Sequence, residues 1–258
     1  MIKSNIRCLV TAGCSYSQVP NRDTTWPIPL HNYLKPAKTL FLGQGAAGNG
    51  IISRKVIKHV TKMLETYKPE NMLVCIMWSG YDRREYYSTT PQDTTYIDCA
   101  NDAYRNPLNI NQDSKECNWY LLNKNWDDTL TTTFYKHFFN EQDSLMIAIE
   151  HILRTQWFLE MHKIPYFMTQ YDYDTFGEYP HDKKIIFNNQ ELNFLHDQID
   201  FSKWLPINNL YEWAKYESGF DFARPPDPHP STEQHKAFVD KIVIPYLLDK
   251  RIISDIIV

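Results

Sequence analysis

The amino-acid sequence predicts an α/β protein in which helices cover both faces of a parallel sheet. Short apolar runs alternate along the chain with segments whose apolar residues recur at helical spacing. The first three runs each lead into a glycine, as strands that end in tight loops do. Strands separated by helices form βαβ units and hence a parallel sheet. We expect about five strands in a single domain, 1–258, with one long insertion at 85–140.

Four apolar runs carry the expected strands. They cover residues 6–12, 39–42, 71–77 and 164–169. Apolar runs with little polar alternation are typical of strands that are buried on both faces. The sequence therefore predicts a sheet that lies inside the molecule.

Three segments carry helical patterns. Apolar residues recur with helical spacing over 50–67, where Pro69 ends the pattern, and over 144–161. Ser231 opens a last helix, with Gln234 three residues later as its capping-box partner.

Two stretches follow neither pattern, and we expect them to be long irregular segments. Residues 85–140 are rich in Asn, Asp, Thr, Tyr and Trp, and residues 171–222 carry two further tryptophans. Loops of this length usually have a function or small elements of their own. The aromatic and amide side chains of the insertion suit sugar rings, and they equally suit packing of the insertion onto the body.

Composition narrows the class of partners. The 258 residues are 43% hydrophobic and 22% charged, with a net charge of −4, so no basic excess attracts nucleic acid or an anionic membrane. No apolar stretch reaches the ~20 residues of a membrane span, and the N-terminus lacks the apolar core of a signal peptide. The five cysteines are scattered, without a CxxC motif. We expect a protein that is cytoplasmic at synthesis, with neither nucleic acid nor membrane as a partner.

Glycines mark the expected site. Six of the eight glycines fall at three strand ends: Gly13, then Gly43, Gly45, Gly48 and Gly50, then Gly80. Ligands of open parallel sheets bind beyond the carboxyl ends of the strands, where glycine allows close backbone approach. We therefore expect these three loops to converge on one crevice.

A serine and a histidine far apart in the chain supply the candidate chemistry. Ser15 follows the first strand, so its hydroxyl and backbone N–H can face the crevice. His229 stands between two prolines, with Asp227 two residues before it. A serine nucleophile needs a base, and the base needs a third group that fixes its tautomer. Taken singly, Ser15 also suits a helix cap and His229 a surface loop.

Four blocks together resemble the SGNH (GDSL-type) hydrolase superfamily. In chain order they are Gly13-Cys14-Ser15-Tyr16-Ser17, Ala46-Ala47-Gly48-Asn49-Gly50, Ser79-Gly80-Tyr81-Asp82 and Asp227-Pro228-His229-Pro230-Ser231. They are similar to the family's Gly-Asp-Ser, second glycine-bearing, Gly-x-Asn and final Asp-and-His blocks, in the family's order. The residues of these blocks are most similar to those of SGNH-like sequences of tailed bacteriophages. The resemblance implies a three-layer αβα sandwich of the flavodoxin-like type.

The resemblance also implies roles. Ser15 is the nucleophile, His229 its base and Asp227 the group that orients the imidazole. The N–H groups of Ser15 and Gly48 form the oxyanion hole, and the loop of Gly80 lines the same site. No cofactor or metal is expected, and the spacing of Asp227, His229 and His235 fits no familiar metal-ligand pattern.

The chain departs from the family where a side-chain donor is expected. Asp82 replaces the family's Asn, and a carboxylate cannot donate to an oxyanion. Loss of one such donor typically costs roughly 10²–10³-fold in rate. A charge ~4 Å from the oxyanion would repel it by about 4 kcal/mol at an effective dielectric constant of about 20. Arg83 or Arg84 could turn Asp82 aside and supply a cation, or Asn49 could supply an amide. Cys14 also replaces the acidic residue before the serine, and Asp227 stands two rather than three residues before His229.

Two functions follow from these observations. The first is hydrolysis of a glycan or small-molecule ester by Ser15, with acyl transfer as a variant that uses the same residues. The alternative is an SGNH-like protein of weak or no activity that binds glycan or has a structural role in a virion or tail, with virion or oligomer contacts as its partners. Asp82 and the aromatic insertion motivate the alternative.

Overall fold

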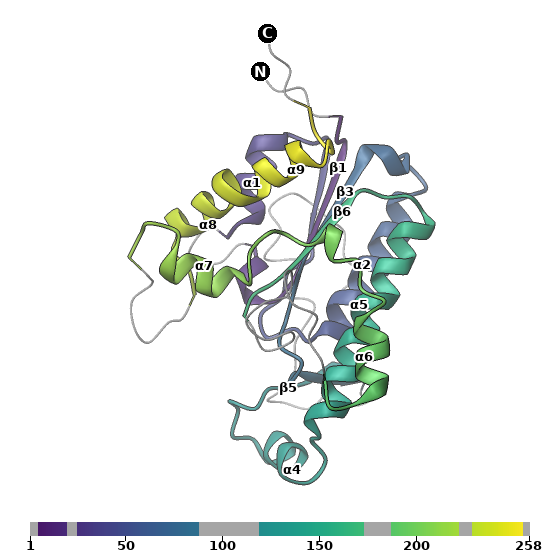
Figure 1. The fold of residues 1–258 in the computed structure, drawn as a ribbon, viewed down its shortest axis with the longest axis vertical. Helices are drawn as coiled ribbons and strands as arrows, with labels where there is room; N and C mark the ends of the chain where they lie inside the picture. The colour runs from purple at the N-terminus through teal and green to yellow at the C-terminus, as the bar shows by residue number, and fades with distance from the viewer. Residues whose placement is uncertain (1–4, 20–24, 88–118, 173–186, 222–228, 255–258) are drawn as a thin grey trace.

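The computed structural model describes residues 5–19, 25–87, 119–172, 187–221 and 229–254. Over these ranges the fold is α/β, as predicted, around a four-stranded parallel sheet of order β2-β1-β3-β6 (Figure 1). Its strands are β1 (Cys8–Ala12), β2 (Lys38–Phe41), β3 (Met72–Trp78) and β6 (Tyr166–Gln170). The four predicted apolar runs are the four strands, with ends shifted by up to two residues.

The strands alternate their side chains between two separate hydrophobic clusters. Val74 and Ile76 of β3 pack into one cluster, whereas Leu73 and Cys75 pack into the other. All seven residues of β3 are buried. Because successive side chains of a strand point to opposite faces, burial of both sets means that each face of the sheet is covered.

One face of the sheet packs against α2, α5 and α6 (Figure 1). These helices are α2 (Asn49–Met63), α5 (Glu141–Met161) and α6 (Gln190–His196). The apolar stripe of α2, which includes Ile52, Val56 and Val60, is fully buried. At the start of α5 the side chain of Asn140 accepts the Asp143 N–H, which satisfies one of the donors that every helix N-terminus leaves open.

The other face packs against helices from both ends of the chain. They are α1 (Pro27–Leu34), α7 (Leu210–Tyr216), α8 (Thr232–Phe238) and α9 (Ile244–Asp249), with the π-helical turn η4 (Val239–Val243) joining the last two. The predicted capping box of α8 is present, since Ser231 and Gln234 each accept from the other's backbone N–H. This box fixes the path of the chain directly after His229.

A fifth strand is reduced to one bridge in the described part of the chain. Trp204 pairs with Met168 of β6 in parallel, and the Leu205 N–H donates to the Met168 carbonyl at 2.9 Å. Pro206 follows and has no N–H to donate, so the ladder stops there. The expectation of about five strands is thus corrected to four.

Both irregular stretches contain small elements that the sequence patterns did not indicate. The region 85–140 contains the antiparallel pair β4 (Arg84–Tyr87) and β5 (Trp119–Leu122), followed by α4 (Thr129–His137). The second stretch contains α6, the 3₁₀ turn η3 (Phe201–Lys203) and α7. These helices have only seven to nine residues, too few to display a sustained period. Residues 88–118 of the predicted insertion lie outside the described residues.

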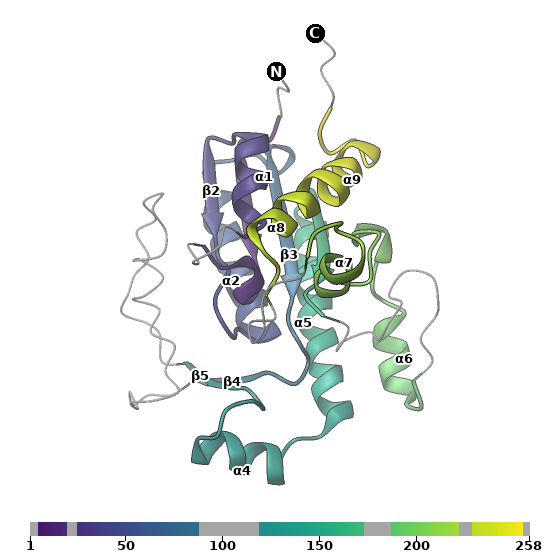
Figure 2. The same ribbon diagram turned by 90° about the vertical axis from the view of Figure 1, so that its left-hand side faces the viewer.

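The strand order reverses where the candidate site was expected. From β1 the chain crosses to β2 on one side, whereas β3 lies on the other side of β1 and leads on to β6. Ligands of open parallel sheets bind at such a reversal, which falls here at the carboxyl ends of the two central strands, β1 and β3. Figure 2 shows β4, β5 and α4 beyond this same end of the sheet.

No helix in the described ranges combines the length and the apolar character that a bilayer span requires.

Candidate active site

The central feature of the site is a hydrogen bond between Ser15 and His229. Ser15 opens the 3₁₀ turn η1 (Ser15–Ser17) directly after β1, and His229 lies on the loop before α8. His229 Nε2 is 2.7 Å from Ser15 Oγ, although the two residues are 214 positions apart. Both side chains are half-buried. The fold therefore brings together the two residues that the sequence proposed as nucleophile and base.

Hydrogen bonds connect the three loops that follow β1, β2 and β3. The Gln44 N–H donates to the Gly13 carbonyl at 3.0 Å, which joins the second loop to the first. Asn49 joins the second loop to the third, because its side-chain amide exchanges two hydrogen bonds with the backbone of Ser79 (3.0 and 2.8 Å). The glycine-rich loops thus converge, as predicted.

Glycine is required where these loops touch. A Cβ on Gly13 would lie 2.8 Å from the Met77 carbonyl oxygen of β3. Backbone atoms cannot withdraw as a flexible side chain can, so a side chain at this position would push the first loop away from β3. The position of Ser15 depends on this close approach.

The side-chain amide of Asn49 holds two loops together. The side chain is 3% exposed, and both its oxygen and its nitrogen bind Ser79. The conjecture that Asn49 donates to an oxyanion is not supported by this geometry. By contrast, the backbone N–H groups of Ser15 and Gly48 donate to no acceptor among the described residues.

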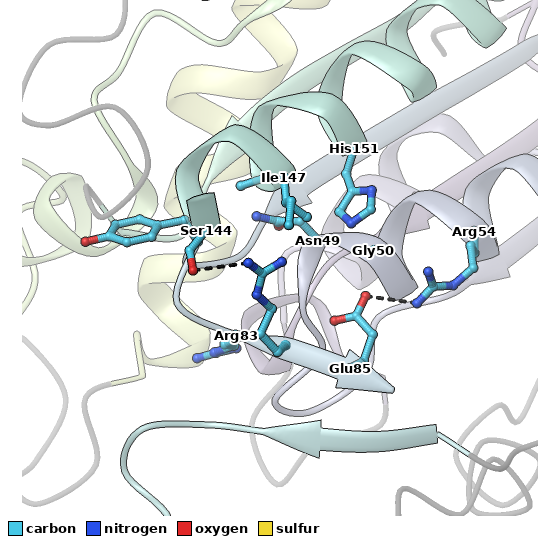
Figure 3. A pocket seen from close by; sticks show the side chains of 11 residues that line it. Asn49, Gly50, Arg54, Arg83, Glu85, Ser144, Ile147 and His151 are labelled. Atoms are coloured by element: carbon cyan, nitrogen blue, oxygen red, sulfur yellow. Dashed lines mark hydrogen bonds and ion pairs between the residues drawn. The ribbon is translucent and has the colours of Figure 1, made fainter. Parts of the chain in front are cut away.

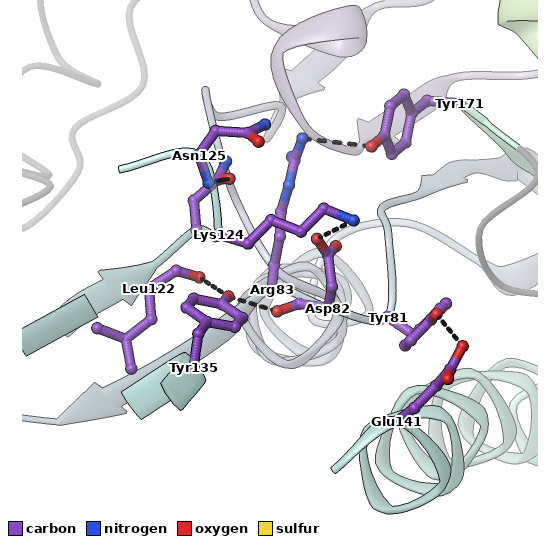
Figure 4. A network of polar contacts seen from close by, with 10 residues as sticks. Tyr81, Asp82, Arg83, Leu122, Lys124, Asn125, Tyr135, Glu141 and Tyr171 are labelled. Atoms are coloured by element: carbon purple, nitrogen blue, oxygen red, sulfur yellow. Dashed lines mark hydrogen bonds and ion pairs between the residues drawn. The ribbon is translucent and has the colours of Figure 1, made fainter. Parts of the chain in front are cut away.

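Asp82 is buried and paired, but with a residue that the sequence did not indicate. Its Oδ2 lies 3.2 Å from Lys124 Nζ, and its backbone carbonyl accepts the Tyr135 hydroxyl (Figure 4). Arg84 pairs instead with Asp143 at 2.7 Å. Among the described residues Lys124, and neither Arg83 nor Arg84, makes the ion pair with Asp82, whereas the suggestion that one of these arginines supplies a cation to the site stays a prediction.

Arg83 brings a cation to the first loop. Burial lowers the pKa of Arg83, but the Cys14 side chain, next to Ser15, and other neighbouring groups outweigh burial and raise it. The Arg83 guanidinium group lies 5.1 Å from the centre of the Tyr171 ring, and its Nη2 is 3.5 Å from the Tyr171 hydroxyl (Figure 4). No ion pair of Arg83 occurs among the residues that the structure describes.

Aromatic rings form one wall of the site. The Tyr16 ring lies 4.7 Å from the His229 imidazole and 5.0 Å from the Tyr171 ring, measured between centroids. Tyr16 is buried, and burial is the main cause that raises its pKa, so its hydroxyl stays neutral. Sequence reasoning missed Tyr16 as a neighbour of His229 and Tyr171 as a neighbour of Tyr16. The position of Tyr171 directly after β6, at the same sheet edge, was the available signal.

The remaining predicted residues lie around this centre. Gly80 is buried in the loop after β3. Asp227, predicted to orient His229, lies outside the described residues. In the described part of the chain, no group of three or more His, Cys, Asp or Glu side chains is arranged to hold a metal ion.

The chain matches a protein family described as a family of unknown function, DUF6071, over residues 18–255. Because this match spans most of the chain, the protein belongs to that family. The matched region begins just after Ser15 and includes His229. The comparisons with curated proteins and with solved structures returned no match.

His235 makes the free energy of unfolding depend on pH. Burial, with a smaller contribution from His229, lowers the pKa of His235 from 6.5 to about 3. Between these two values the unfolded chain binds a proton that the folded chain does not. The free energy of unfolding should therefore fall as pH decreases below 6.5, by up to ~1.4 kcal/mol per pH unit from this group.

Urea unfolding of wild type and His235→Gln between pH 6.5 and 4 measures this slope. The variant should show the smaller dependence on pH, whatever its stability at pH 7. The exposed His137 provides the control His137→Gln, which should keep the wild-type slope. Equal slopes for wild type and His235→Gln would contradict the assignment.

Proposed function

We propose that this protein is a serine ester hydrolase of the SGNH type, with Ser15 as nucleophile and His229 as general base. The observation that carries the proposal is the 2.7 Å contact between Ser15 Oγ and His229 Nε2, with Ser15 directly after the carboxyl end of β1. A nucleophile and base within hydrogen-bond reach are the common geometric requirement of such catalysis.

The order of steps follows from these groups. Ser15 Oγ attacks the ester carbonyl while His229 Nε2 takes the hydroxyl proton, and the carbonyl oxygen becomes an oxyanion. The tetrahedral intermediate then collapses, His229 returns the proton to the departing alcohol oxygen, and the acyl group stays on Ser15. A water molecule, deprotonated by His229, releases the acid in the same way. Acyl transfer would replace this water by a sugar hydroxyl.

The uncommitted N–H groups of Ser15 and Gly48 support an oxyanion hole. Gly48 stands directly before α2, where helix N–H groups and the helix dipole favour negative charge. Asp227 is proposed to orient the His229 imidazole, as the resemblance implies. Two covered sheet faces and the reversal between β1 and β3 support the three-layer SGNH-like sandwich.

Arg83 is proposed to replace the side-chain donor that the family's Asn supplies. The Arg83 guanidinium lies 5.1 Å from the Tyr171 ring, which in turn contacts the ring of Tyr16 next to Ser15, whereas the Asp82 carboxylate is paired with Lys124. A guanidinium group beside the developing oxyanion stabilises it by charge as well as by hydrogen bonding.

Arg83→Met should lower kcat/KM for an activated ester by roughly 10²–10³-fold. Arg83→Lys, which keeps the charge, should recover part of this loss. Asp82→Asn is the matched control. It should change kcat/KM by less than about threefold, because the Asp82 carboxylate forms an ion pair with Lys124. A large gain in Asp82→Asn would place its carboxylate at the oxyanion and contradict this assignment.

The experiment that tests the function is turnover of 4-nitrophenyl acetate and of acetylated sugars by wild type and by His229→Ala. The proposal requires turnover by wild type that is lost in the variant. Binding on a glycan array without turnover of any ester would instead favour the alternative, a glycan-binding or virion protein.

A further inference from the structure

A polar cavity lies beside the proposed oxyanion hole. It encloses about 170 Å³ between the first turns of α2, the first turns of α5 and the segment 81–85 (Figure 3). One water molecule needs only about 10–15 Å³ of such volume, so the cavity has room for a small organic group. Its charged lining consists of Arg54, Arg83, Arg84 and Glu85, with His151 above them.

Positive charge exceeds negative charge in this lining. Glu85 Oε1 accepts from Arg54 at 2.9 Å, and the carboxylate lies against Gly50 in the first turn of α2. Burial raises the pKa of Glu85, and the nearby Arg54 opposes this rise. Arg84 contacts Asp143 through Nη2 only, and that carboxylate is 56% exposed. Arg83 makes no ion pair among the described residues.

His151 reports the sign of the field in the cavity. Burial is the main cause that lowers its pKa to about 4, and the guanidinium groups of Arg154, Arg54 and Arg84 lower it further. The imidazole is therefore neutral at pH 7. Arg84 Nε is buried and has no hydrogen-bond acceptor among the described residues. The cavity thus combines surplus positive charge with a donor that lacks an acceptor.

We infer that this cavity binds a carboxylate of the substrate, so that the enzyme acts on esters of acidic sugars or of similar monoanions. That the substrate is an ester rests on the proposed function, and that it carries a carboxylate rests on the cavity. The lining holds three arginines against Glu85, and Asp143, which pairs with Arg84, lies outside it, so positive charge is in excess and an anionic group such as a carboxylate is favoured.

The cavity lies close enough to Ser15 to hold part of the same substrate. The Glu85 carboxylate packs against Gly48 and Gly50, where a Cβ would collide with it. Arg83 lines the cavity and also lies beside Tyr171, whose ring contacts Tyr16, the residue after Ser15. A substrate whose carbonyl oxygen is bound by the Gly48 N–H therefore has its neighbouring groups beside the cavity.

Affinity for D-glucuronate against D-glucose, measured by calorimetry or NMR titration, tests the inference apart from turnover. The Ser15→Ala variant, which cannot form an acyl-enzyme, should bind glucuronate at least ~10-fold more tightly than glucose. Adding Arg84→Gln should bring the two affinities within about threefold of each other. Lys236→Gln, an exposed change on α8, is the charge-matched control and should have no effect.

Asp143→Asn keeps the cavity folded and removes the carboxylate that competes for Arg84, so it should tighten glucuronate binding. Equal affinities for the two sugars, or no loss in Arg84→Gln, would overturn the inference. Tighter binding of inorganic phosphate than of glucuronate would also overturn it. If wild type hydrolyses neutral esters while glucuronate fails to bind, the proposed function stands and only the acid site is wrong. Glucuronate binding without turnover of any ester would support the acid site and count against the proposed hydrolysis.

Discussion

Ser15→Ala is expected to lower kcat/KM for an activated acetyl ester by roughly 10⁴–10⁶-fold, close to the uncatalysed rate. The side-chain oxygen that accepts the acyl group is lost, and neighbouring groups cannot replace it. Ser17 is unsuitable because it is fully buried and its hydroxyl oxygen accepts the Trp26 indole N–H. Initial rates with 4-nitrophenyl acetate measure the effect.

The double variant Ser15→Ala/His229→Ala separates a catalytic pair from two independent contributions. Residues that act as one unit give non-additive losses, so the double variant should be no slower than the worse single variant. Ser202→Ala, which truncates an exposed serine of η3, is the matched control and should keep wild-type activity. Additive losses would mean that the hydrogen bond between Ser15 and His229 is not the catalytic contact.

Gly43→Ala is expected to destabilise the protein by about 3 kcal/mol and to abolish most activity. A Cβ at this position would lie 2.9 Å from the Gln18 backbone nitrogen and still closer to the Ser17 carbonyl group. These are backbone atoms of the turn that carries Ser15, so relief of the clash must move that turn. The melting temperature should fall by roughly 6–12 °C.

Gly45→Ala offers a matched control two residues away. There the Cβ would meet only the end of the Gln18 side chain, at 2.9 Å, and that side chain can rotate. The change should cost about 1 kcal/mol or less and leave most of the activity. Equal effects of the two substitutions would contradict the claim that the loop after β2 supports the turn of Ser15.

The sequence was sufficient to predict the frame of the fold because burial leaves a strong pattern. Strands covered on both faces are continuous apolar runs, and β3 is such a run over all seven residues. The α8 capping box was also readable, since Ser231 and Gln234 lie within one turn. The prediction of a fifth strand was wrong because only Trp204 forms a bridge before Pro206 ends the pairing.

The candidate site was readable where a backbone requirement or a motif marked it. Glycines marked the three converging loops, and the resemblance placed Ser15 and His229 together before any distance was known. The partner of Asp82 was not readable, because Lys124 lies 42 residues further on, beyond a stretch without a sustained pattern. Nor could the sequence show that Asn49 binds the Ser79 backbone. An asparagine with a structural role and one that donates to an oxyanion are the same residue type.

Whether Ser15 is an activated nucleophile can be measured by locating the adduct of a fluorophosphonate probe by mass spectrometry. The probe forms a bond from the attacking serine oxygen to phosphorus and releases fluoride, so it marks a serine that has been activated by a base. We predict a single adduct on Ser15, within the tryptic peptide of residues 8–22, that is lost in Ser15→Ala and strongly reduced in His229→Ala. Equal labelling of wild type and Ser15→Ala, or an adduct on another serine, would contradict the assignment of Ser15 as the nucleophile.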